Sequence, residues 1–186
     1  LTSITLPERL TSIGVGAFCD CSSLSSITLP EGLNSIEEAV FRECSSLHII
    51  NLPATLISIK KTAFYKCSSL TSITLPERLT SIGEHAFYKC RRLTNITLPE
   101  RLTSIEGSVF RECSSLHIIN LPATLISIKK SAFYGCSSLT SITFPDGMVS
   151  IGQSAFKNCS SLADIKFSET SEVEVTIGHR AFGGCT

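Results

Sequence analysis

The sequence predicts an α/β repeat solenoid, and three observations support this fold class. The pattern Leu-x-x-Ile-x-Leu-Pro-x-x-Leu-x-x-Ile-x-x-x-Ala-Phe-x-x-Cys-x-x recurs eight times at a period of 23 residues, with its first Leu at positions 1, 24, 47, 70, 93, 116, 139 and, in a modified last copy, 162. Phe and Cys recur in every copy, and Pro recurs in the first seven. A unit this short cannot bury its apolar side alone, so neighbouring copies must stack. We therefore expect residues 1–186 to form a single repeat domain.

The first element of each repeat is a short strand. Leu1, Ile4 and Leu6 point inward, while Ser3 and Thr5 point outward, because successive side chains of a strand alternate between its two faces. Stacked copies then form a parallel sheet with neighbouring strands about 4.8 Å apart. The proline that follows lacks an N–H and ends the strand.

The rest of the repeat contains a second inward pair and a turn. Leu10 and Ile13 indicate a second short extended stretch. Ala17, Phe18 and Cys21 then share the spacing of one face of a helical or 3₁₀ turn, which is the reason for the α/β assignment.

The residue after the second stretch is Gly in four copies and charged in the other four. The charged copies carry Glu37, Lys60, Glu106 and Lys129 at the place of Gly14. We therefore expect that a left-handed conformation is not required at this position.

Two departures from the simple period are visible. The eighth copy carries three extra residues within Ser168–Thr176, and we interpret it as a partial cap. The segment Val40–Lys61 recurs unchanged as Val109–Lys130, three repeats later. This identity indicates that a three-repeat block was copied, so features doubled in it need not be doubled functions.

Composition excludes several classes of function. Lys plus Arg equals Asp plus Glu at 16 each, so no broad positive field attracts nucleic acid. No apolar run approaches the roughly 20 residues that span a bilayer, so membrane insertion is not expected. The chain begins with Leu in phase with the repeat and shows no signal-peptide pattern, so we expect it to be a piece of something longer.

The core motif LPxxLxxIGxxAFxxCxxLxxIxLP resembles the BspA-like, or treponemal-type, leucine-rich repeat family along the whole chain. The resemblance implies a leucine-rich-repeat-type right-handed coil. It also implies a non-enzymatic protein-interaction module at the cell surface or secreted, in the manner of an adhesin fragment that binds a host or partner protein, or a glycan.

Eight of the nine cysteines follow the repeat and are expected to be free, buried thiols. Cys19 is outside the column, and we expect it to point outward as a reactive thiol or as a chance surface residue. No CxxC pair stands at metal-binding distance from a second pair, so we expect no zinc.

Catalysis is not expected either. His48 and His117 occupy equivalent places three repeats apart, about 15 Å along the stack, too far to share a metal or a proton. No Ser, His and acid constellation and no phosphate-binding loop can be assembled. We therefore predict no enzyme, no cofactor and no metal.

The outward strand positions carry the predicted binding site. Most of them are Ser or Thr, but two copies present His, Ile and Asn there, an exposed aliphatic group beside hydrogen-bonding groups. The candidate partner-binding residues are His48, Ile49, Asn51, Thr74, Asn95, Thr97, His117, Ile118 and Asn120. The alternative is that Ile49 and Ile118 only serve strand propensity.

Charged side chains are expected at the edges of the rod. Glu-Arg pairs such as Glu77 and Arg78 follow the Pro turn, whereas basic pairs such as Arg91 and Arg92 lie on the opposite side. We expect these charges mainly to provide solubility.

Two other functions compete with partner binding. A structural scaffold would self-associate through the ends of the repeat array. A regular Ser-x-Thr ladder could bind ice, although the His-Ile-Asn strands interrupt it twice.

Overall fold

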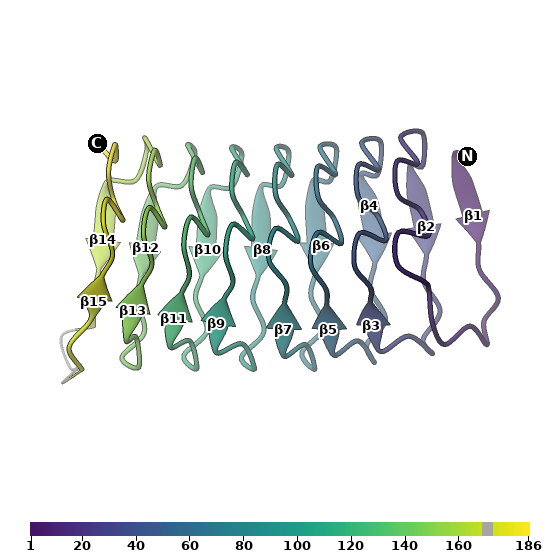
Figure 1. Ribbon diagram of the computed structural model, residues 1–186, viewed down its shortest axis with the longest axis horizontal. Helices are drawn as coiled ribbons and strands as arrows, with labels where there is room; N and C mark the ends of the chain where they lie inside the picture. Colours follow the sequence, from purple (N-terminus) through teal and green to yellow (C-terminus); the bar gives the residue numbers. More distant parts are fainter. Residues whose placement is uncertain (169–172) are drawn as a thin grey trace.

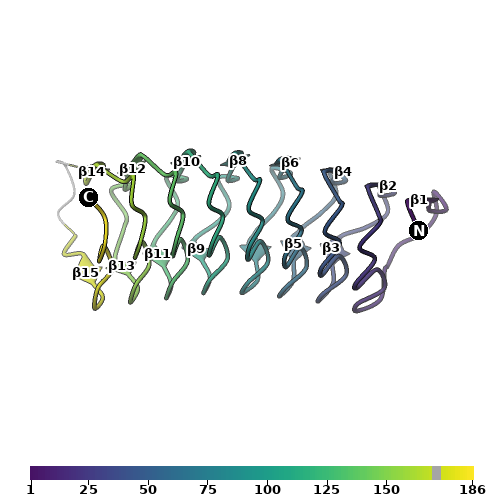
Figure 2. The ribbon, with the colours of Figure 1, turned by 90° about the horizontal axis from the view of Figure 1, so that it is seen from above.

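The computed structural model describes residues 1–168 and 173–186, which form a rod of stacked coils with the two termini at opposite ends (Figure 1). Each coil after the first contributes one strand to each of two opposite sides of the rod, and the first coil contributes β1 alone (Figure 2). A tight turn segment completes the coil. Leu and Ile side chains from both sides meet in one continuous core.

The first side is built from three-residue strands whose central residue points inward. Neighbours pair in parallel with a register of 23 residues, as in Ile4 opposite Ile27. The strands are β1 (Ser3–Thr5), β2 (Ser26–Thr28), β4 (Ile49–Asn51), β6 (Ser72–Thr74), β8 (Asn95–Thr97), β10 (Ile118–Asn120), β12 (Ser141–Thr143) and β14 (Asp164–Lys166).

The second side is built from two-residue strands. The last of them pairs Ser150 with Thr176, a step of 26 residues that absorbs the three extra residues of the eighth copy. Residues 169–172 of that insertion lie outside the described residues. The strands are β3 (Ser35–Ile36), β5 (Ser58–Ile59), β7 (Ser81–Ile82), β9 (Ser104–Ile105), β11 (Ser127–Ile128), β13 (Ser150–Ile151) and β15 (Thr176–Ile177).

The strand ladder of the first side is divided into three sheets. They contain β1-β2-β4, β6-β8-β10 and β12-β14, so the ladder is interrupted after β4 and again after β10. These two strands have the same sequence, Ile-Ile-Asn, and belong to the duplicated segment. Both interruptions thus occur at the same place of the copied block.

The prediction of a helical turn, and with it the α/β class, is wrong, because the described residues contain no helix. Amides such as that of Cys67 donate to the carbonyl three residues back, on Phe64, at 3.1 Å. Alternate amides point along the rod instead, and the Phe64 N–H donates to the Ala86 carbonyl of the next coil at 2.8 Å. The spacing of small and apolar residues therefore reflects consecutive turns in a parallel-strand β-solenoid.

Left-handed residues prevent the turn segment from becoming a helix. Two residues of each coil in this segment have positive φ, for example Thr62 at 56° and Lys66 at 57°. The expectation for Gly14 is confirmed, because the left-handed positions begin two residues later, at Gly16.

The phenylalanine column forms the centre of the core. Consecutive rings from Phe18 to Phe182 stack with centroids 5.0–5.6 Å apart. Six rings of the column are fully buried, at Phe41, Phe64, Phe87, Phe110, Phe133 and Phe156.

Candidate functional site

The predicted binding residues lie together on the outer surface of the first side. His48 precedes β4 and His117 precedes β10, and all nine candidates are exposed. Ile49 and Ile118 keep 49% and 57% of their surface exposed, so an aliphatic side chain stands beside the polar side chains of this face. The sequence therefore placed this face correctly, whereas its binding role remains a prediction.

A hollow accompanies each of the two Ile-Ile-Asn strands. The hollow between β4 and β6 is lined by Asn51, Leu52, Ala54, Thr74 and Pro76, together with Glu31, Glu77 and Arg78, and measures about 490 Å³. The hollow between β10 and β12, of about 350 Å³, contains the equivalent Asn120, Leu121, Ala123, Thr143 and Pro145 in its lining. Both hollows coincide with the interruptions of the strand ladder.

An alanine after the Pro turn belongs to each hollow. Other copies carry Glu or Asp at this place, whereas the duplicated segment carries Ala54 and Ala123. The Ala54 amide donates to Glu31 Oε2 at 3.0 Å, and the Ala123 amide donates to Glu100 Oε2 at 2.9 Å. The small alanine side chain thus leaves space at the surface. The glutamate of the preceding coil accepts the hydrogen bond of the alanine backbone N–H.

Ala54 and Ala123 are not among the residues that the strand pattern predicts for the binding face. The signal that could have found them is the change from Pro-Glu-Arg to Pro-Ala-Thr, which occurs only in the two copies that also carry His-Ile-Asn. The hydroxyl of Thr55 bonds the carbonyls of Glu31 and Leu33 at 2.6 and 2.7 Å, so the exchange is accommodated by backbone hydrogen bonds.

The two patches have the same sequence but different neighbours. Ile49 lies opposite Ser26, and Ile118 lies opposite Asn95. The Nδ1 atom of His48 is 3.4 Å from the carbonyl of Ser46, two residues earlier, whereas that of His117 is 3.4 Å from the carbonyl of Ser138, 21 residues later.

Asn95 and Thr97 on β8 lie between the two patches. Thr74 differs from them because it lines the first hollow itself. Three coils separate the hollows, about 14 Å along the rod.

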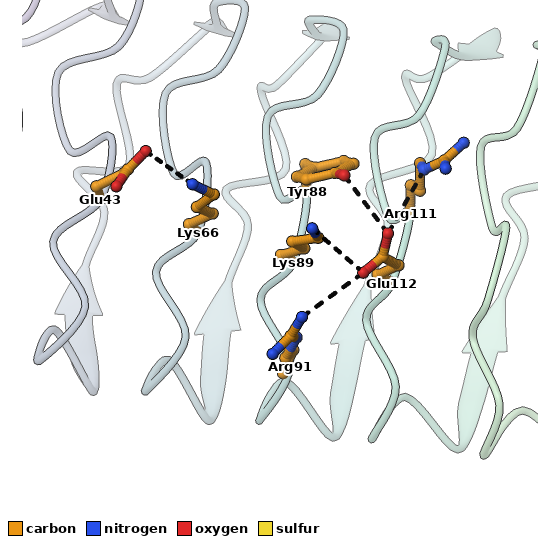
Figure 3. Close-up of polar contacts among 7 residues, drawn as sticks. All are labelled: Glu43, Lys66, Tyr88, Lys89, Arg91, Arg111 and Glu112. Atoms are coloured by element: carbon orange, nitrogen blue, oxygen red, sulfur yellow. Dashed lines mark hydrogen bonds and ion pairs between the residues drawn. The ribbon is translucent and has the colours of Figure 1, made fainter.

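A second cluster of polar residues lies on the turn segments (Figure 3). Lys66 is 3.0 Å from Glu43. Glu112 accepts the Tyr88 hydroxyl at 3.4 Å and lies 3.6–3.8 Å from three cations, those of Lys89, Arg91 and Arg111. The hydrogen bond with Tyr88 and the carboxylate of Glu112 raise the pKa of Lys89. Nearby, burial lowers the pKa of His85, which favours its neutral form.

The cysteine column is structural. All nine cysteines are free thiols, and those from Cys44 to Cys159 in the column are buried. The Cys90 Sγ donates to the Phe64 carbonyl of the preceding coil at 3.2 Å, and the equivalent bond recurs along the column. Burial raises the pKa of the thiols of Cys44, Cys67 and Cys90, to about 12 at Cys44.

Cys19 is half-buried rather than fully outward. Its Sγ donates to Asp20 Oδ2 at 3.3 Å. Burial, with this bond, raises its pKa, so the structure disfavours a thiolate there.

Within residues 1–168 and 173–186, no three His, Cys, Asp or Glu side chains converge as a metal site would require. The same part of the chain offers no helix with the length and apolar character to cross a membrane.

The comparison with known proteins agrees with the repeat geometry of the fold. The family model described as BspA type leucine rich repeat region (6 copies) matches residues 1–99 and 80–186. No curated protein matches.

Solved structures of bacterial leucine-rich repeat proteins share the fold. A protein from Bacteroides ovatus ATCC 8483 is 26% identical, with a TM-score of 0.63 over all of this chain and 65% of that one, so this chain spans slightly less than two thirds of it. The Treponema pallidum protein TpLRR is 29% identical, with a TM-score of 0.78 over 87% of this chain and 78% of that one.

A leucine rich cell surface protein from Faecalibacterium prausnitzii A2-165 is 22% identical, with a TM-score of 0.54 over 91% of this chain and 80% of that one, a likeness of fold alone. The matched family is a repeat family and not an enzyme family. The 23-residue register, the stacked Phe and Cys columns and the family match over the whole length agree, and the chain belongs to the BspA-type leucine-rich repeat family.

Proposed function

We propose that this chain is a protein-interaction module of a cell-surface or secreted adhesin and that it binds its partner through the face formed by the three-residue strands. The observation that carries the proposal is the coincidence, at two places, of an exposed isoleucine with a hollow in the same coil. The match to the BspA-type leucine-rich repeat family supports a protein-interaction role.

The chemistry of each patch suits a protein partner. An exposed aliphatic side chain gives apolar area, while the histidine and the asparagine beside it supply hydrogen-bonding groups. The hollow next to Asn51 is lined by Leu52, Ala54 and Pro76, so a small apolar side chain of a partner could fill it. The Ser and Thr side chains of the other strands offer much less apolar area.

The experiment replaces Ile49 and Ile118 by Lys and measures binding to immobilised extracellular-matrix proteins by surface plasmon resonance. Both side chains point outward, so the fold should persist. In the complex, however, the variant would bury two lysine charges where the parent buries two apolar side chains. We expect binding to fall at least tenfold, since large losses arise at such anchor residues.

The chain supplies a matched control on its opposite side. Ile57 and Ile126 lie in the same two coils, immediately before β5 and β11, and keep 42% and 47% of their surface exposed. Replacing both by Lys adds the same charge without touching the proposed face. If this control lost binding and the Ile49 and Ile118 variant did not, the contact would belong to the two-residue strands.

A second variant tests the hollows separately from the isoleucines. Replacing Ala54 and Ala123 by Glu introduces the residue that Glu77 and Glu100 already provide in other coils, so the fold is compatible with it. Filling both hollows should weaken binding while the thermal unfolding temperature stays unchanged. Unchanged affinity would exclude the hollows from the contact.

A further inference from the structure

The turn segments carry a groove that the proposed protein contact does not use. It runs along the rod across four coils and has a volume of about 510 Å³. Its lining consists of charged side chains and serines, namely Asp20, Ser22, Glu43, Ser45, Lys66, Ser68, Lys89 and Arg91. Such a lining offers hydrogen bonds and charge to a ligand.

Charge is separated along this groove. Asp20 and Glu43 occupy its first two coils, and Lys66, Lys89 and Arg91 occupy the next two. Beyond the positive half, the carboxylate of Glu112 is shared by Lys89, Arg91 and Arg111 (Figure 3). One carboxylate facing three cations leaves an excess of positive charge on a chain whose net charge is zero.

Arg91 is the most accessible cation of the positive half, since Lys66 and Lys89 keep 41% and 27% of their side chains exposed. Arg91 keeps 60% of its side chain exposed, and its guanidinium lies 3.7 Å from Glu112. A guanidinium has five N–H donors, so the remaining donors are available to an anion.

An internal comparison shows that these arginines are not needed for the fold. Arg91 and Arg92 occupy the place of a Ser-Ser pair in the other copies, such as Ser68 and Ser69. The serine performs a structural task at this place, since the Ser68 hydroxyl donates to the Ser45 carbonyl of the preceding coil at 3.5 Å. The repeat with Arg-Arg thus departs from the pattern at the point where the groove is most positive.

We propose that the positive half of this groove binds a sulfated polysaccharide. A linear polymer follows the rod, because the cations come from successive coils about 4.8 Å apart. Sulfate groups contact Lys89 and Arg91, while sugar hydroxyls bond the serine row at Ser45 and Ser68. Lys66 is paired with Glu43 at 3.0 Å, and the carboxylates of Asp20 and Glu43 repel a polyanion and confine it to the part of the groove beyond them.

The test measures binding of a heparin dodecasaccharide by isothermal titration calorimetry at two salt concentrations. The variant Arg91→Ser with Arg92→Ser restores the Ser-Ser pair, and Lys89→Asn introduces the residue present at the left-handed position of Asn158. We expect the triple variant to bind about tenfold more weakly and to show a smaller dependence on salt, because three positive charges are lost.

The matched control is Arg78→Thr with Arg101→Thr, which removes two arginines at the Pro turn, where Thr55 and Thr124 stand in other coils. This control should change heparin affinity less than twofold. Loss of affinity in the control equal to that in the triple variant would show a diffuse charge effect and overturn the site.

Two competitors define the ligand class. Single-stranded DNA and poly-glutamate of equal charge should displace heparin poorly, because they do not present sulfates together with sugar hydroxyls in the same pattern. Equal displacement by either polymer would overturn the assignment to a sulfated glycan. Ile49→Ser with Ile118→Ser should leave heparin binding intact, which separates this site from the proposed protein contact.

Discussion

At the scale of single residues, the fold depends on the Phe column and the Cys column, which stabilise it in different ways. The Phe rings supply buried area and stack on both neighbours, as Phe87 does on Phe64 and Phe110. The Cys thiols are smaller and satisfy carbonyl groups, as Cys90 does for Phe64. A phenyl ring cannot donate such a bond, so the two residue types are not interchangeable.

We expect Phe87→Ala to reduce the free energy of unfolding by about 3–5 kcal/mol, because a fully buried ring is removed from between two others. Phe182 is half-buried and stacks on Phe156 at 5.4 Å, so Phe182→Ala should cost less. Urea unfolding followed by circular dichroism measures both values. Equal losses would contradict a stability shared between neighbouring coils.

Cysteine reactivity should follow burial and pKa. The nucleophile is the thiolate, and a raised pKa lowers its population at neutral pH. We therefore expect Cys19 to react with a maleimide slowly at pH 7 and faster as the pH rises above the ordinary thiol pKa of 9.0. Buried thiols such as Cys67 should react only after unfolding. Mass spectrometry of the labelled native protein checks this order, and fast labelling of the column would contradict it.

At the scale of the element, the turn segment is the part of the repeat that differs most from expectation. Its alternate amides connect successive coils, as between Phe64 and Ala86, and this ladder joins the turns as the strand ladders join the two sides. Positive φ at many residues with side chains is the geometric condition for this arrangement.

At the left-handed positions, introducing a glycine and removing one should have opposite effects on the stability of the protein. A left-handed conformation costs a residue with a Cβ about 1–2 kcal/mol, and glycine removes that cost while adding chain entropy to the unfolded state. Ala39→Gly should therefore stabilise the protein by a few tenths to about 1 kcal/mol, since Ala39 has a φ of 57°.

The reciprocal change, Gly135→Ala at a φ of 71°, should destabilise it by a similar amount. The nearest atom that the new Cβ would meet is Glu112 Cγ at 3.5 Å, an ordinary contact, so the cost would come from the backbone. Thermal unfolding measures both variants. Opposite signs would support the geometry, and a stabilising Gly135→Ala would contradict it.

At the scale of the whole molecule, the rod places two equal patches on one face. Three coils hold the hollows about 14 Å apart, a distance that one globular partner can span. Two weak contacts on a rigid scaffold reinforce each other, because the second contact forms at a high effective concentration.

This geometry predicts unequal effects of single and double changes. Either Ile49→Lys or Ile118→Lys alone should leave one contact and weaken binding modestly, whereas both together should reduce it by more than either single change. Surface plasmon resonance with the same immobilised matrix proteins compares the three variants. A double variant no weaker than one of the singles would show that the partner uses one patch.

The sequence by itself determined the 23-residue coil, the inward Leu, Ile, Phe and Cys columns and the outward His-Ile-Asn residues, because these follow from the local alternation of side chains and from burial. The tertiary structure decided that the Ala-Phe-x-x-Cys segment forms turns rather than a helix, since its alternate amides bond to the next coil and a single repeat does not contain that partner. It also decided where the hollows and the charged groove lie. Ala54 and Arg91 contact side chains one repeat away, on Glu31 and Glu112. The stacking of the coils sets the distances of these contacts.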